Sequence, residues 1–349
     1  MNHAIALTTT VLLAVVMAGC GGDEAPADGD PTSSAQSAPS PEPSESEPEV
    51  AEPTYLPAGD LPRELTLEAV GARTVPALPF ADFAVAAGDG VWVSGVAPGA
   101  VRYDADGRIT ARARVPGDVA QALAAGSGSV FVPSLNPSLL LRLDAVTGAE
   151  MGRVKLPASP LVESAVGAAA GRAYVLVEPS EPRIAVIEGD RIVEELPAPE
   201  GAVAVRAGYG SLWVPTADHT VGRYDLASGS WTTIPVGPKP RFLDVGFDAV
   251  WVMNQGDGSV SRVDARTGAA EQIPVTGEPI GGGDLTVGAG AVWLRTDSAV
   301  VRIDPRTRAA THVIVPPPGS ASAAATDDFL LITNHDHDAV HVVALPLPG

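Results

Sequence analysis

The amino-acid sequence predicts an all-β fold, a seven-bladed β-propeller with four antiparallel strands per blade. Its 349 residues include 37 glycines and 33 prolines, a composition typical of many short strands joined by turns. A large apolar residue also recurs about every forty residues, a period typical of propeller blades. These anchors are Trp92, Phe131, Tyr174, Trp213, Trp251, Trp293 and, in a degenerate last copy, Leu331.

The clearest copy has four expected strands, at residues 242–245, 250–252, 260–263 and 272–275. The third alternates apolar and polar residues with the period of two that a half-buried strand has. Between the third and fourth strands, Asp264 begins a turn that ends at Gly268. An aspartate carboxylate accepts backbone N–H groups there, and glycine tolerates a positive φ. Each copy of the repeat therefore predicts one blade.

Six complete units begin near residues 83, 122, 164, 203, 242 and 284. The seventh supplies only three strands, near residues 321–325, 329–332 and 340–343. We expect an N-terminal segment, either residues 64–70 or residues 73–78, to supply the fourth strand of this last blade. Such pairing covers two free sheet edges, which would otherwise invite aggregation. Residues 60–349 are therefore assigned to the propeller.

The formal net charge is −20. A surface this acidic offers no basic patch to displace counterions from phosphates, which excludes nucleic acid as a partner. Residues 21–53 are rich in carboxylates, proline and serine and contain no basic residue. Such a segment buries too little apolar surface to offset the entropy of ordering. We therefore assign residues 20–59 to a lipidated cysteine followed by a disordered tether.

Residues 1–19 have the features of an export signal, because the apolar run at residues 4–18 is too short to span a membrane. Its end, Met17-Ala18-Gly19-Cys20, resembles the lipobox of bacterial lipoproteins. The resemblance implies cleavage before Cys20 and attachment of a palmitate-containing lipid to its thiol. The protein would then be anchored in the cell membrane, facing outside the cytoplasm. An ordinary secretory signal is the alternative, although no disulfide explains the single cysteine.

The pattern VWV-x-N, then V-x-R-x-D-x-x-T-G, then I-x-V resembles the repeats of YVTN-type and virginiamycin B lyase-like seven-bladed propellers. The resemblance covers nearly all of residues 80–343 and implies the fold. In the lyases the second strand typically carries a glutamate. The corresponding positions here are Gly95, Ser134, Val177, Thr216, Asn254, Thr296 and Asn334. The tryptophans and turn aspartates are interpreted as packing residues and hairpin caps.

The candidate site lies in the loops that join second and third strands, because these open on one face around the axis of a propeller. In the last copy, residues 334–338 read Asn-His-Asp-His-Asp. Imidazole and carboxylate groups bind divalent metals or exchange protons. The ligand-binding candidates are therefore His335, Asp336, His337 and Asp338, with Asp297 of the preceding copy, and the metal candidates are His335 and His337. An ordinary solvated loop is the alternative interpretation.

Two classes of function remain, and no catalytic residue is identified for either. One is a non-catalytic scaffold at the cell envelope, without a cofactor, that binds a protein, peptide or glycan. Arg206, Lys239 and Arg241, expected in or near inter-blade loops, would contact its anionic groups. The other is a metal-assisted lyase or hydrolase that acts on a small extracellular molecule. The sequence contains no CxxC, HExxH, GxSxG or phosphate-binding loop to decide between them.

Overall fold

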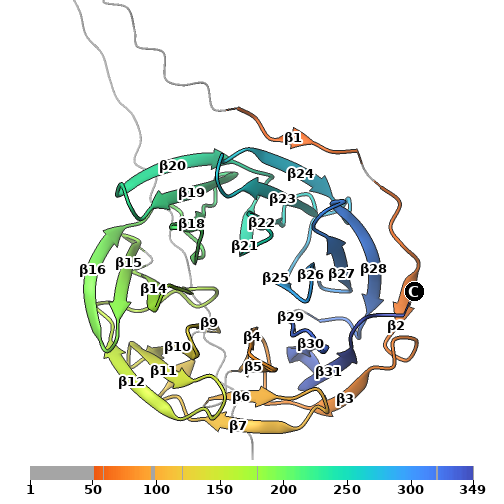
Figure 1. Cartoon of the computed structure of the whole chain (residues 1–349), viewed down its shortest axis with the longest axis horizontal. Helices are drawn as coiled ribbons and strands as arrows, with labels where there is room; N and C mark the ends of the chain where they lie inside the picture. The colour runs from red at the N-terminus through yellow and green to blue at the C-terminus, as the bar shows by residue number, and fades with distance from the viewer. Residues whose placement is uncertain are drawn as a thin grey trace, which may run out of the picture. The chain divides into compact units, whose positions relative to one another are not determined.

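The computed structural model describes residues 51–57, 59–95, 99–119, 121–178, 180–319 and 321–348. Seven sheets stand around a central axis (Figure 1), which confirms the seven-bladed propeller with four antiparallel strands per blade. The predicted export signal, Cys20 and the tether up to residue 50 lie outside the described residues. Within the described ranges, no helix is long and apolar enough to cross a membrane.

In each blade the strands run from the axis outward in chain order, and we call them A, B, C and D. Blade 1 consists of β4 (Ala84–Ala87), β5 (Gly90–Ser94), β6 (Ala100–Tyr103) and β7 (Ile109–Ala113). Blade 2 consists of β9 (Ala124–Gly126), β10 (Ser129–Asn136), β11 (Leu139–Asp144) and β12 (Glu150–Lys155), and β8 (Asp118–Val119) also pairs with β10. Blade 3 consists of β13 (Val166–Ala169), β14 (Arg172–Val177), β15 (Arg183–Glu188) and β16 (Arg191–Pro197).

The next three blades have the same order. Blade 4 consists of β17 (Arg206–Gly208), β18 (Ser211–Pro215), β19 (Thr220–Asp225) and β20 (Ser230–Pro235). Blade 5 consists of β21 (Pro240–Gly246), β22 (Ala249–Asn254), β23 (Ser259–Asp264) and β24 (Ala270–Pro274). Blade 6 consists of β25 (Asp284–Gly288), β26 (Ala291–Arg295), β27 (Val300–Asp304) and β28 (Ala309–Val315).

Blade 7 is composite. Its first three strands are β29 (Ala323–Ala325), β30 (Phe329–Asn334) and β31 (Ala339–Ala344), and the 3-10 turn η1 (His335–His337) lies between the last two. The D strand is β3 (Arg73–Pro76), which pairs antiparallel with β31 from Arg73 opposite Val342 to Pro76 opposite Ala339. The expected closure by an N-terminal strand is therefore present, and of the two candidate segments residues 73–78 provide it.

The other candidate segment, residues 64–70, lies elsewhere. Its strand β2 (Glu64–Thr66) pairs parallel with β28 as a fifth strand of blade 6. Further upstream, β1 (Thr54–Tyr55) pairs parallel with β24 of blade 5. Thr54 and Tyr55, which the sequence assigned to the tether, are therefore ordered against a blade, because the outer edge of β24 offers unpaired backbone groups. The N-terminal segment thus follows the outside of the ring from blade 5 to blade 7 (Figure 1).

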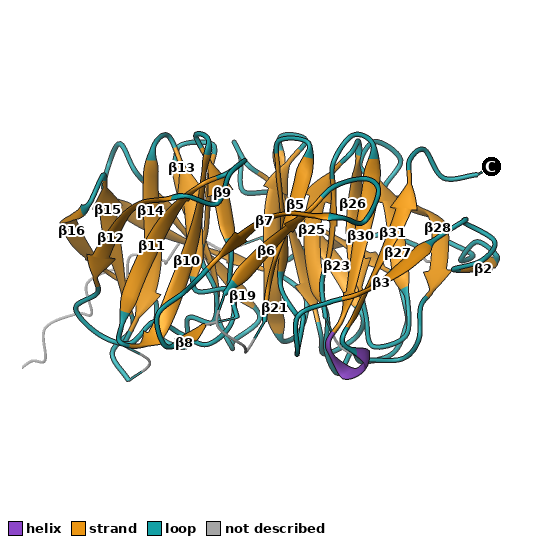
Figure 2. Cartoon of the chain, turned by 90° about the horizontal axis from the view of Figure 1, so that it is seen from below, coloured by secondary structure: helices purple, strands orange, loops and turns teal. Residues whose placement is uncertain are grey.

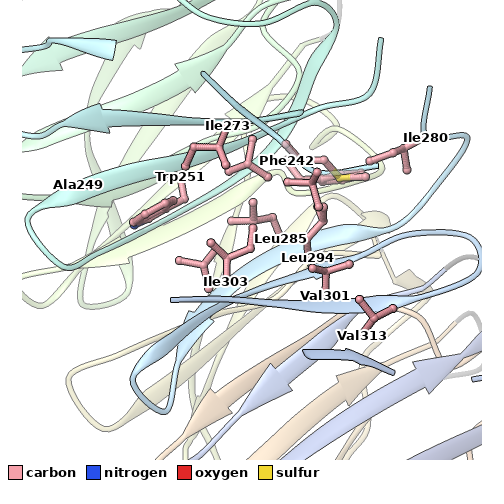
Figure 3. Packing of buried hydrophobic residues seen from close by; sticks show 14 of the residues in the cluster. Phe242, Ala249, Trp251, Ile273, Ile280, Leu285, Leu294, Val301, Ile303 and Val313 are labelled. Carbon is pink, nitrogen blue, oxygen red and sulfur yellow. The ribbon is translucent and has the colours of Figure 1, made fainter. Parts of the chain in front are cut away.

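Apolar side chains fill the space between neighbouring blades. Between blades 5 and 6, Phe242 and Trp251 belong to one buried cluster with Leu285, Leu294 and Ile303 (Figure 3). The indole N–H of the fully buried Trp251 donates to the carbonyl of Gly246 at 3.1 Å, so its polar atom is satisfied. The repeated anchors are therefore packing residues, as the sequence predicts.

Aspartate side chains hold the turns between C and D strands. The Oδ1 atom of Asp264 accepts the N–H groups of Thr267 and Arg266 at 2.7 and 3.2 Å. These bonds hold the pKa of Asp264 below its usual range, with the Thr267 N–H as the largest cause. In blade 6, Arg308 occupies the glycine position at φ 61°. Its guanidinium bonds Glu271 of blade 5 at 2.7 Å, a contact between blades that offsets the backbone strain.

Candidate functional site

The connections between strands lie on two opposite faces of the ring. The B–C loops and the links from one blade to the next form what we call the loop face, which carries η1 (Figure 2). The A–B and C–D turns form the hairpin face at the other end of the strands. The predicted site therefore lies on the loop face, where side chains from different blades meet near the axis.

A cavity of about 260 Å³ opens at the axis on the loop face, and we call it the axial cup. Most of its lining comes from links between blades, and the rest comes from B–C loops and from the start of β21. Aromatic rings, paired charges and two amide side chains face this space together. The lining residues are Phe80, Asp82, Phe83, Gln121, Glu163, Arg241, Phe242, Gln255, Gly281, Gly282, Gly283 and His335.

His335 is the predicted candidate that lies in the axial cup. Its ring stacks on Phe80, with centroids 4.3 Å apart and planes at 8°. Its Nδ1 atom lies 3.6 Å from Asp82 Oδ1, and its Nε2 atom lies 3.1 Å from Asp336 Oδ1. The neighbouring Asp82 carboxylate raises the pKa of His335, although partial burial of the ring opposes this. Burial raises the pKa of Asp82, which the neighbouring His335 opposes, so each group favours the charged form of the other.

The other candidates of this loop have different positions. Asp338 ends η1 at φ 45°, and its Oδ1 atom accepts the N–H of Phe80 at 2.8 Å. Its carbonyl accepts the N–H of Ala77 at 2.9 Å, so Asp338 fastens the N-terminal segment to blade 7. Asp336 and His337 are exposed. Only His335 of these four therefore lines the axial cup.

The oxygens of Asp297 likewise accept hydrogen bonds from backbone N–H groups. Its Oδ2 atom accepts the N–H of Gly281 at 2.9 Å, and its carbonyl accepts the N–H of Gly319 at the same distance. Burial lowers the pKa of Arg295 to about 10, while the charges of Asp297 and Asp336 oppose that change. Asp297 thus orders the links before and after blade 6 on the loop face. Among the described residues, no group of three or more His, Cys, Asp or Glu side chains comes together in a way that could hold a metal ion.

Several functional candidates of the axial cup were not expected from the sequence. Glu163, in the link before blade 3, forms an ion pair of 2.6 Å with Arg241 of β21. The Arg241 guanidinium also lies 5.5 Å from the centre of the Phe242 ring. Both charged side chains remain about one-third exposed, so they are accessible to a ligand. Polar residues before or at the start of A strands are the sequence signal for these positions. Of the two charged residues, the sequence analysis singled out only Arg241.

Arg206 lies next to an inter-blade link, as expected, but its side chain does not face the loop face. It begins β17 and lines a second cavity of about 260 Å³, enclosed by the A strands along the axis. Its guanidinium donates to the carbonyls of Val205 and Val166 at 3.0 and 3.1 Å. Burial raises the pKa of the nearby Asp284 to about 7, which the charge of Arg206 opposes. Arg206 therefore faces the channel, not a ligand on the loop face.

No protein-family model and no curated protein sequence matches the chain. Many solved structures are similar to it in fold, among them the following two. BamB from Moraxella catarrhalis has a TM-score of 0.53 at 12% identity, over 78% of this chain and 98% of that one. The β-propeller domain of Cps50 (Swd1) from Myceliophteria thermophila has a TM-score of 0.63 at 9% identity, with the same two coverages. At these identities the likeness shows the fold alone.

The pairing of Asp82 with His335 predicts a measurable change in acidity. In the Asp82→Asn variant the pKa of His335 should fall, because the neighbouring charge that favours the imidazolium is lost. NMR titration of the imidazole resonance measures this value, with a His335→Gln variant to assign the resonance.

The same change predicts a difference in stability. A raised folded-state pKa stabilises the fold below the ordinary pKa of histidine, and this gain disappears as the pH rises through the raised value. The free energy of unfolding of the wild type should therefore rise as the pH falls through this range, and that of the Asp82→Asn variant should not. An unchanged His335 pKa in the variant would contradict the pairing.

Proposed function

We propose that the protein is a cell-envelope lipoprotein whose propeller is a non-catalytic binding scaffold for an extracytoplasmic protein, peptide or glycan. The axial cup carries this proposal. Its lining comes from links and loops of six blades, so a ligand there contacts many rigidly placed groups at once. The accessible Glu163–Arg241 pair supplies a charged donor and a charged acceptor, and the amides of Gln121 and Gln255 supply neutral ones.

The arrangement of the polar groups favours recognition over catalysis. His335 lies between two carboxylates and against an aromatic ring, an environment that fixes its position and raises its pKa. Arg241 is paired with Glu163 and lies over Phe242. Such fixed, paired groups present a preorganised surface to a ligand. The repeat pattern supports membership among YVTN-type and virginiamycin B lyase-like propellers, while the missing second-strand glutamate argues against the lyase reaction.

The axial cup predicts which substitutions weaken binding. With ligands selected on a glycan array and from a peptide-display library, Arg241→Ala should weaken binding by about tenfold or more, roughly 1.4 kcal/mol. Glu163→Gln should strengthen binding of an anionic ligand and weaken binding of a cationic one, because it frees the Arg241 guanidinium.

A matched control is Arg183→Ala, which removes an arginine from a surface ion pair of 3.6 Å with Glu195 in blade 3. This variant should bind like the wild type. Selected ligands that bind normally to both Arg241→Ala and Glu163→Gln would show that the axial cup is not the recognition site.

The anchoring part of the proposal depends on Cys20. Replacing Cys20 with Ser removes the thiol that the lipid requires, so the protein should move from the membrane fraction to the soluble fraction outside the cytoplasm. Cell fractionation followed by mass spectrometry of the mature N-terminus measures both location and lipid. A wild-type protein that is already soluble and begins at another residue would contradict lipid anchoring.

A further inference from the structure

The hairpin face has an irregularity in blades 4 and 5. In six blades the A–B turn has two central residues, and the first of them adopts a positive φ. Such turns favour Gly, Asn or Asp at that position, because Cβ crowds the backbone at positive φ and a bulky side chain adds to the strain. Four blades have small residues there, namely Gly88, Ser127, Ala170 and Ala289, but blades 4 and 5 have Tyr209 at φ 54° and Phe247 at φ 55°.

Both aromatic side chains face solvent. Tyr209 is 45% exposed and Phe247 is 41% exposed. The Tyr209 hydroxyl accepts the N–H of Asp248 at 2.9 Å, which holds the ring of blade 4 against the turn of blade 5. Leu226, 39% exposed, lies in the adjacent C–D turn, and its N–H donates to the carbonyl of Gly210 at 3.0 Å. Tyr209, Leu226 and Phe247 are therefore exposed apolar side chains on turns that bond one another, and we call these three residues the rim patch.

Packing inside the ring does not account for the rim patch, because its side chains point away from the buried clusters. Bulky residues at strained turn positions destabilise the fold, and they persist where another role selects them. Contiguous exposed aromatic residues mark interaction surfaces. Tyrosine in particular lies at membrane–water interfaces, where its ring contacts the acyl boundary and its hydroxyl remains wet.

The N-terminal segment indicates what covers the rim patch. Because β1 pairs parallel with β24, it begins at the end of β24 that follows the C–D turn, on the hairpin face. Ala51 and Glu52 line a groove with Thr267 and Gly268 of that turn. The described chain thus begins at the same face and beside the same blades as the rim patch. A lipid at Cys20 would be attached upstream of this point.

We propose that the rim patch seats on the lipid surface to which the chain is anchored. The proposal rests on the lipid anchoring proposed above. Tyr209, Leu226 and Phe247 enter the interfacial region, and the exposed Arg266 in the neighbouring C–D turn of blade 5 lies beside lipid phosphates. The hairpin face is then turned toward the bilayer. The axial cup, on the opposite face, is turned toward its ligand.

An orientation measurement tests this seating. The mature chain from Cys20 onward is coupled through its single thiol to a maleimide lipid in vesicles of phosphatidylcholine and phosphatidylglycerol in equal parts. Phe247→Trp places an indole in the rim patch, and Val162→Trp places one on the loop face, at a residue that is 51% exposed. Brominated acyl chains quench indole fluorescence only at close range.

The indole fluorescence of the Phe247→Trp chain should fall when brominated lipids replace ordinary ones. The fluorescence of the Val162→Trp chain should fall no more than that of the unsubstituted protein. Adding Tyr209→Ser and Leu226→Ser to the Phe247→Trp chain should reduce that loss. Equal losses for both indoles, or no loss for Phe247→Trp, would overturn the seating. Because the anchor is supplied chemically, this result is independent of whether cells lipidate Cys20.

Discussion

The pairing of β3 with β31 is the constraint on which the rest of the structure depends. Each blade buries its two faces against neighbours, so the first and last blades are satisfied only when the ring closes. Four residues, Arg73–Pro76, complete blade 7 by pairing with residues more than 260 positions away. The hydroxyl of Thr74 also bonds the buried His341 at 2.8 Å. Closure therefore fixes both the sheet and its core.

The axial cup is a product of this closure. The segment that follows β3 carries Phe80 and Asp82 to the loop face, where they meet His335 from the other end of the chain. Asp338 holds Phe80 through its backbone, and the Thr333 hydroxyl donates to the carbonyl of Asp82 at 2.6 Å. Without β3 in place, blade 1 would still form its own strands, but the cup would lose one wall.

The repeat made the fold predictable, because an anchor, a capped turn and alternating strands recur in nearly every copy. Asp264 and its equivalents are local signals, in which one side chain caps its own turn. The short strands β1 and β2 have no such signal, because the edges that they cover belong to distant blades.

The site was predictable only in part for the same reason. His335 stood out by composition, but its partner Asp82 is distant in the sequence. The Glu163–Arg241 pair joins the link before blade 3 to the first strand of blade 5, so no local spacing reveals it. Asp297 and Asp338 are carboxylates, as a ligand site requires, but their side-chain oxygens accept backbone N–H groups of the protein itself. Sequence identifies residue types on a face, whereas the closed ring decides which of them meet.

Amide hydrogen exchange followed by mass spectrometry tests the closure most directly. Peptides that contain β3 and β31 should exchange together and as slowly as the inner strands of the other blades, since they open only when the ring opens. The peptide with β1 should exchange much faster, because only two residues pair there. If residues 73–76 exchanged as fast as β1 while β31 stayed protected, the ring would be closed in another way and the account would be wrong.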